Sequence, residues 1–212
     1  MKKAKQHKVN MYTVDVTNIR KTPKIKKNNI VRTIGWGTKL HGYKWEGWFY
    51  TKKGCIKLSC LSKKQPKYRT VYAPYVKHTK SYMPLCSITN RATKQYALRV
   101  NYAYTGKYGI AMAKNRYLVA MASYFNLSIG QYFDLVLADG TVIPCIMGDA
   151  KANRHTDSAT HSYTVATQCM SEFIIGSVST LKRYLHGSGS LSAIKEFSSP
   201  VKMVRIYNKT LF

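Results

Sequence analysis

Acidic residues are scarce in this chain of 212 residues: 8 aspartates and glutamates stand against 35 lysines and arginines, which gives a formal net charge of +27. The excess is uneven, because residues 1–80 carry +19 and residues 81–212 carry +8. A field of this sign attracts polyanions such as nucleic acids, anionic membranes and anionic cell-wall polymers. A solvated surface that only keeps the protein in solution is the alternative for the N-terminal part.

Long hydrophobic runs are also missing. No stretch approaches the roughly 20 apolar residues that span a bilayer, and the lysines at the N-terminus are not followed by the apolar region of a secretory signal. We therefore expect neither a membrane span nor a signal peptide. The hydrophobic fraction of 45% and the 17 tyrosines still supply enough apolar surface for a packed core.

Cysteines number only five, and none of them form a CxxC pair. An odd number without this spacing indicates neither a zinc site nor a complete disulfide framework. We expect mostly free, buried thiols, with a single Cys145–Cys169 bridge as the alternative. The sequence gives no reason to expect a metal or another cofactor.

The chain contains many short segments with the alternating pattern of β-strands. Residues 1–64 are predicted to hold a small all-β unit with a hairpin that turns at Lys53-Gly54. Residues 65–84, with their lysines, tyrosines and prolines, are predicted to be a linker. Residues 85–212 are predicted to form a second β domain.

The second β domain is expected to contain a strand over residues 96–104 and a hairpin at Asp139-Gly140. Helices are expected only as short pieces, around residues 179–184 and 191–197. Many short strands at close spacing favour barrels, which remove exposed sheet edges. The predicted fold class is therefore mainly β, with few short helices.

Three segments of the first unit follow the order and spacing of a bacterial SH3 domain. They are residues 17–23 (TNIRKTP), 34–40 (IGWGTKL) and 47–50 (GWFY). The pattern departs from that family at Thr22, where glycine is usual, and at Cys55 or Ile56, where a second tryptophan is expected. The chain thus resembles this family over about residues 9–64.

The resemblance to a bacterial SH3 domain implies a small SH3-like β-barrel that binds peptidoglycan. Trp48 and Tyr50 would offer flat apolar faces to a sugar or peptide, while the surrounding lysines attract an anionic wall. The alternative is that these aromatic side chains fill the core of the barrel.

Residues 109–157 carry a second resemblance, which is most specific in the segment "IMGDAKANRHTD". The segment resembles the three-aspartate domain of bacterial and phage cell-wall proteins and of MltA-type lytic transglycosylases. This resemblance implies a six-stranded double-psi β-barrel over residues 85–212. It also implies cleavage of the glycan strand of peptidoglycan, without a cofactor.

By position in this motif, Asp157 matches the proton donor of the family and Asp149 the aspartate before it. One protonated carboxylic acid would protonate the glycosidic oxygen and then, as a base, take the proton of the muramoyl C6 hydroxyl. Lys151 and His155 would contact the substrate. The first of the three family aspartates is replaced by Ala122, and a simple turn role for both aspartates remains the alternative.

Three functions are consistent with these patterns. The first is a peptidoglycan-degrading enzyme of lytic-transglycosylase type with an SH3-like targeting module, acting at the bacterial wall from a phage virion or after host lysis. The second is a non-catalytic phage tail or wall-binding protein, whose partners would include other virion proteins; Ala122 favours it. The third is a nucleic-acid binder, which ranks last because no recognition motif accompanies the charge.

Overall fold

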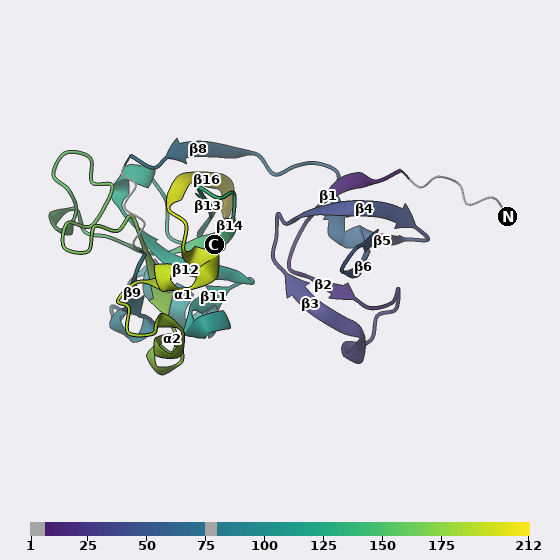
Figure 1. The fold of residues 1–212 in the computed structure, drawn as a ribbon, viewed down its shortest axis with the longest axis horizontal. Helices are drawn as coiled ribbons and strands as arrows, with labels where there is room; N and C mark the ends of the chain where they lie inside the picture. Colours follow the sequence, from purple (N-terminus) through teal and green to yellow (C-terminus); the bar gives the residue numbers. More distant parts are fainter. Residues whose placement is uncertain (1–6, 75–79) are drawn as a thin grey trace. The chain divides into compact units, whose positions relative to one another are not determined.

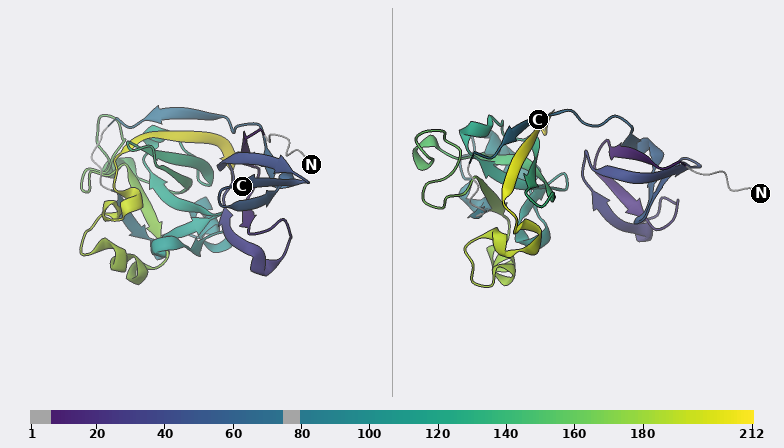
Figure 2. Two further views of the ribbon diagram at one scale, coloured as in Figure 1. Left: turned by 45° about the vertical axis from the view of Figure 1, so that its right-hand side comes forward. Right: turned by 45° about the horizontal axis from the view of Figure 1, so that its top comes forward.

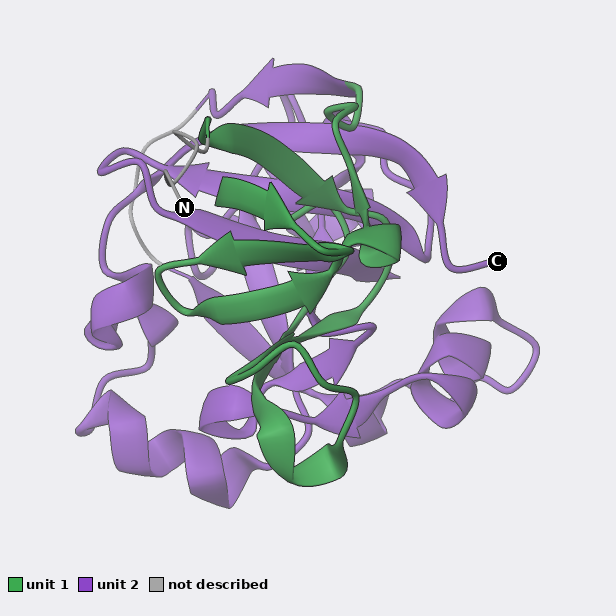
Figure 3. Ribbon diagram, turned by 90° about the vertical axis from the view of Figure 1, so that its right-hand side faces the viewer, with its two compact units in different colours: residues 1–67 green, residues 68–212 purple. Residues whose placement is uncertain are grey.

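The computed structural model describes residues 7–74 and 80–212, and the chain divides into two compact units, residues 1–67 and 68–212 (Figure 3). Within the described residues both units are built mainly from strands, and only two α-helices occur, both in the second unit. The predicted mainly β fold class is confirmed. The two units are referred to below as unit 1 and unit 2.

Unit 1 is a seven-stranded sheet in the order β3-β2-β6-β5-β4-β1-β7. Its strands are β1 (Val9–Thr13), β2 (Thr17–Arg20), β3 (Ile30–Ile34), β4 (Lys39–Trp45), β5 (Trp48–Thr51), β6 (Gly54–Lys57) and β7 (Leu61–Ser62). Strands β4, β5 and β6 follow one another as antiparallel neighbours, and β1 pairs with both β4 and β7. The first strand of the unit, β1, is therefore hydrogen-bonded to the last, β7.

The core of unit 1 comes from alternate residues of these strands. Phe49, Ile19 and Ile56 are fully buried at its centre. The predicted β5–β6 hairpin is confirmed, but Thr51 pairs with Gly54, so the turn lies one residue earlier than predicted, at residues 52–53.

Unit 2 contains a nine-stranded sheet whose main path runs β10-β11-β12-β14-β13-β16-β8. Strand β15 pairs with β12, and β9 pairs with β15. Figure 1 shows β8, β16, β13 and β14 following one another. The strands are β8 (Tyr68–Tyr72), β9 (Ser81–Pro84), β10 (Tyr104–Thr105), β11 (Ala111–Ala113), β12 (Arg116–Met121), β13 (Gln131–Leu137), β14 (Val142–Ala150), β15 (Ser171–Ile175) and β16 (Val201–Thr210).

The β13–β14 hairpin at Asp139-Gly140 is confirmed by the antiparallel register of the two strands. The glycine has φ +84°, a left-handed conformation that glycine adopts without strain. Around this hairpin, a core of apolar residues from β12 to β16 is buried together with side chains of helix α2 (Val178–Leu185).

The strand predicted over residues 96–104 is wrong, because helix α1 (Lys94–Asn101) covers most of this segment. The Oγ1 atom of Thr93 accepts a hydrogen bond from the backbone N–H of Tyr96 at 3.2 Å, which is an N-cap. Leu98 anchors the helix and is 1% exposed. The helix expected near residues 179–184 is confirmed as α2.

The second expected helical piece, residues 191–197, is present as two short 3₁₀ helices, Leu191–Ala193 and Lys195–Phe197.

The linker predicted over residues 65–84 is also wrong in most of its length. Strand β8 is antiparallel to β16, and β9 is parallel to β15, so both belong to the sheet of unit 2. Figure 2 shows β8 beside β16. Both pairings join segments that are far apart in sequence, and they add two strands to the seven that the structure describes in residues 85–212, where six were predicted. Residues 75–79 of the predicted linker lie outside the described residues.

All five cysteines are free, and Cys55, Cys145 and Cys169 are buried. The prediction of mostly free, buried thiols is confirmed, and the alternative bridge between Cys145 and Cys169 is not formed. In the part of the chain that the structure describes, neither helix has the length and apolar character needed to cross a membrane.

Candidate functional site

A row of four residues crosses unit 2, one residue on each of four neighbouring strands. Asp149 of β14 and Glu172 of β15 are both in register with Ala120 of β12, which lies between them. Ser81 of β9 is in register with Glu172 on its other side. Residues in register on adjacent strands project from the same face of a sheet. The small side chain of Ala120 therefore separates two acidic side chains that share one face.

A β-bulge determines which face of the sheet Asp149 occupies. The register of β14 against β12 shifts after Met147, and Gly148 is the extra residue. Side chains alternate along a regular strand, so Asp149 would otherwise share the core face of Met147; the bulge moves it to the opposite face. A Cβ atom at Gly148 would lie 2.5 Å from Cδ1 of Ile174 and 3.2 Å from Cβ of Leu118, so a larger residue at the bulge would force the buried side chain of Ile174 to move.

Glu172 is held by hydrogen bonds to both carboxylate oxygens. The Nζ of Lys151 lies 2.9 Å from Oε2, and the Oγ of Ser81 donates to Oε1 at 3.3 Å. The side chain of Lys151 is 6% exposed, compared with 23% for Glu172. Lys151, which is predicted to contact substrate, therefore forms a partly buried ion pair with Glu172.

Asp149 is half-buried and has a raised pKa. Burial is the main cause, because it disfavours the charged form, and the negative charge of Glu172 adds to it. Hydrogen bonds from the backbone N–H of Ala150 and the side chain of Gln95, together with the positive charge of Lys151, oppose the increase. Asp149 therefore keeps its proton to a higher pH than an ordinary aspartic acid.

The two carboxyl groups line a cavity of about 980 Å³. Lys151 and His155, the residues predicted to contact substrate, line the same cavity, and so does Arg154. The Nε of Arg154 donates to Nε2 of the exposed His155 at 3.2 Å. The cavity thus combines a carboxyl group whose pKa is raised, a paired carboxylate and basic groups.

Asp157, the predicted proton donor, does not line this cavity. Its Oδ1 accepts hydrogen bonds from the backbone N–H groups of Ser162 (2.6 Å) and Tyr163 (3.1 Å), and its Oδ2 accepts from the N–H and hydroxyl of Thr160 (both 2.7 Å). Burial alone would raise the pKa of Asp157, but these hydrogen bonds outweigh it and hold the pKa well below its usual range. A carboxylate in this state is a poor proton donor, so the sequence-based assignment of Asp157 is corrected. Asp157 instead fixes the turn that follows it.

The two predicted aromatic contacts lie on β5 of unit 1, on the face opposite Phe49. Tyr50 lines a separate pocket, where its ring stacks on Tyr43 with centroids 5.3 Å apart. Trp48 is half-buried and pairs across the hairpin with Trp45, and it does not line that pocket. Neither predicted contact belongs to the core cluster of unit 1.

Sequence reasoning missed Glu172, Gln95 and Ser81. Glu172 lies beyond residues 109–157, which carry the resemblance, and only the strand register brings it near Asp149. Gln95 belongs to helix α1, whose N-cap Thr93 was an available signal. Ser81 lies in the segment interpreted as a linker.

The site contains acids and bases suited to proton transfer. Among the described residues, no group of three or more histidines, cysteines or acidic residues could hold a metal ion. Ala122, which the sequence resemblance aligns with the first family aspartate, is 1% exposed and directly follows β12. No family model, curated protein or solved structure matches the chain.

Proposed function

We propose that unit 2 cleaves the glycan strand of peptidoglycan by a lytic-transglycosylase reaction in which Asp149, rather than Asp157, is the proton donor. The observation that carries the proposal is a half-buried carboxyl group with a raised pKa in a cavity of about 980 Å³. General acids work best when their pKa lies near the operating pH, and burial is the usual way to raise it.

In the proposed reaction, the proton of Asp149 moves to the glycosidic oxygen as the bond from that oxygen to C1 of the muramoyl residue breaks. The C6 hydroxyl oxygen of the same residue then bonds to C1, and its proton returns to the Asp149 carboxylate. The products are a 1,6-anhydromuramoyl end and a new free hydroxyl, and no water is consumed. Positive charge develops on the sugar ring, and the Glu172 carboxylate on the same face would stabilise it.

Unit 1 is proposed to be the wall-targeting module. The pairing of β1 with β7 and the β4–β5–β6 meander support its resemblance to an SH3-like barrel. Tethering such a module to a catalytic unit raises the local substrate concentration. The protein would act at the bacterial cell wall, either from a phage virion or after host lysis.

Mass spectrometry of soluble products from purified peptidoglycan sacculi tests the reaction. The wild-type chain should release muropeptides with anhydromuramoyl ends, and Asp149→Asn should lower this release by about 10²–10⁴-fold, the usual contribution of acid–base catalysis. Asp139→Asn is the matched control, because Asp139 is exposed in the β13–β14 turn, and it should retain activity. If the wild type binds sacculi but releases nothing, the chain is instead a non-catalytic wall-binding protein.

The pH profile tests the role of Glu172 independently. Glu172→Gln removes a nearby negative charge, so the pKa of Asp149 should fall. The loss of activity on the basic side of the pH profile should then begin at a lower pH than in the wild type. Lys151→Met should move the same limb to higher pH, because it removes a positive charge. Equal profiles for both variants would contradict the assignment of Asp149 as the titrating acid.

A further inference from the structure

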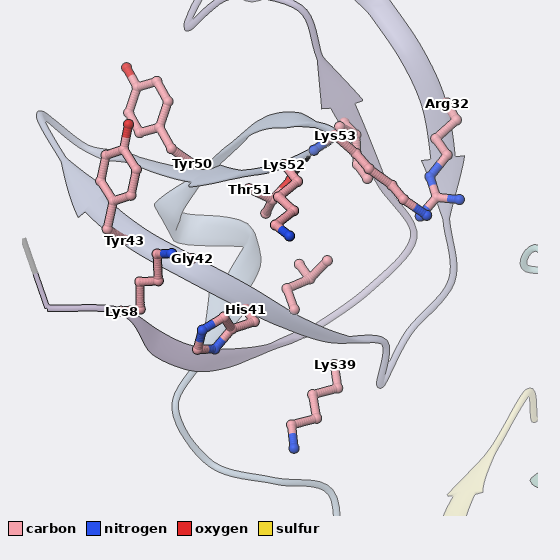
Figure 4. A pocket seen from close by; sticks show the side chains of 12 residues that line it. Lys8, Arg32, Lys39, His41, Gly42, Tyr43, Tyr50, Thr51, Lys52 and Lys53 are labelled. Carbon is pink, nitrogen blue, oxygen red and sulfur yellow. Dashed lines mark hydrogen bonds between the residues drawn. The ribbon is translucent and has the colours of Figure 1, made fainter. Parts of the chain in front are cut away.

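A second pocket, of about 540 Å³, lies in unit 1 and is lined by basic side chains from several strands. Lys39 and His41 come from β4, Arg32 from β3, and two lysines from the β5–β6 turn (Figure 4). The basic residues that line the pocket are Lys8, Arg32, Lys39, His41, Lys52 and Lys53.

The charge of this basic pocket is uncompensated. No aspartate or glutamate lines it, and within the described residues none of its five lysines and arginines takes part in a salt bridge. All five are exposed. Like charges gathered around one hollow repel each other and create a local positive potential, which a bound anion would relieve.

The shape of the basic pocket depends on a close approach of β4 to β5. A Cβ atom at Gly42 would lie 1.9 Å from the carbonyl oxygen of Tyr50, so only glycine permits this packing. Buried Ile19 and Leu40 supply apolar lining. At one end Tyr43 and Tyr50 stand side by side, with their ring planes 9° apart (Figure 4).

We propose that the basic pocket binds an acyclic polyol-phosphate polymer of the bacterial cell wall. Cations from β3, β4, the β5–β6 turn and the residue before β1 line one hollow, an arrangement that suits a chain with repeated phosphates better than a single anion. Four of the five cations are lysines, whose flexible point charges follow a polyphosphate without requiring a fixed geometry.

The choice of this polymer over nucleic acid rests on the proposed wall-directed function and on the tyrosine pair. Single-stranded nucleic acids are usually held by aromatic rings that stack on successive bases. Here Tyr43 and Tyr50 stack on each other, so each ring has one face already covered. A polyol-phosphate chain has no bases and needs no such platform.

Binding of a fluorescent synthetic poly(glycerol phosphate) decamer to the full chain, measured by anisotropy, tests the proposal. Arg32→Gln/Lys52→Gln/Lys53→Gln should weaken binding at least about tenfold and reduce the slope of log K against log salt by about 2, as expected for three lost phosphate contacts. The matched control Lys27→Gln/Lys63→Gln/Lys64→Gln removes the same charge at exposed positions outside the pocket. It should weaken binding less than threefold.

Equal losses in the two triple variants would overturn the proposal, because the attraction would then come from net charge alone. Tighter binding of a thymidine decanucleotide, lost selectively in the pocket variant, would overturn it in favour of nucleic acid. The proposed function fails separately: Asp149→Asn should bind the decamer like the wild type, and absence of glycan cleavage with intact decamer binding would refute only the enzymatic proposal.

Discussion

The buried ion pair of unit 2 allows a quantitative prediction. Arg116 and Asp134 have side chains that are 3% and 9% exposed and form a salt bridge. The guanidinium group also donates to the carbonyl oxygens of Cys145 (3.0 Å) and Phe133 (2.8 Å), and the hydroxyl of Tyr207 donates to Oδ2 of Asp134 at 2.5 Å. One network therefore joins β12, β13, β14 and β16.

Replacing Asp134 with alanine leaves a buried guanidinium group without its counter-ion. Breaking one side of such a pair costs about 3–5 kcal/mol, and a buried hydroxyl without an acceptor costs roughly 1–3 kcal/mol more. These costs overlap, so we expect a loss of about 4 kcal/mol. At ~3 °C per kcal/mol for a unit of this size, the melting temperature of unit 2 should fall by about 12 °C.

The matched variant Arg116→Met/Asp134→Leu/Tyr207→Phe removes every charged or hydroxyl group of the network at once. Buried pairs replaced by apolar side chains of similar volume often cost little, so this variant should be more stable than Asp134→Ala. If the triple variant loses as much stability as the single one, or if Asp134→Ala lowers the melting temperature by less than about 3 °C, the reasoning is refuted.

Far-UV circular dichroism reports the unfolding of both units, so the transition of unit 2 is the one that tryptophan fluorescence does not show. The three tryptophans are Trp36, Trp45 and Trp48, all in unit 1, so tryptophan fluorescence in the same samples reports on that unit. The fluorescence transition should remain at the wild-type temperature and serves as an internal control.

Two further predictions concern groups outside the cavity. Lys80 is 1% exposed, and burial lowers its pKa to about 8 from 10.5. Between these pH values the unfolded chain therefore binds more protons than the folded chain. The free energy of unfolding of unit 2 should therefore rise with pH in this window by up to ~3 kcal/mol. Urea titrations at several pH values, run in parallel on the wild type and Lys80→Met, measure this rise. An equal pH dependence of the two proteins would contradict the prediction. Asp157→Asn replaces one of the two acceptor oxygens with an NH2 group, so the backbone amides on that side, either Thr160 or both Ser162 and Tyr163, should exchange with deuterium faster. Unchanged protection of all three amides would show that Asp157 does not hold the turn.

Local signals account for the elements that could be predicted. Alternation with period two indicates most strands, and the Asp139-Gly140 turn specifies the β13–β14 hairpin because glycine adopts its left-handed conformation. Helix α1 was misread because Tyr96, Leu98 and Val100 also suit a strand, and the N-cap decides between the two structures. Tertiary pairing, rather than local pattern, places β8 and β9 in the sheet.

In the candidate site, too, local sequence predicts some residues and tertiary pairing brings in the others. Asp149, Lys151 and His155 lie in one short segment, so the motif brings them together and the structure places all three at one cavity. Glu172 joins them only through the register of β15 on β12. The role of Asp157 could not be read from sequence, because a catalytic acid and a turn-fixing carboxylate are the same residue type and differ only in the hydrogen bonds they accept.

The pairing of β8 with β16 affects how unit 2 can be produced separately. Strand β16 is ten residues long and lies between β13 and β8. A fragment that starts at residue 85 would lack β8 and would present the free backbone N–H and C=O groups of β16 to other molecules. Long uncovered edges of this kind promote self-association through intermolecular strand pairing. A fragment starting at residue 68 keeps the edge covered and should remain monomeric where the shorter one aggregates.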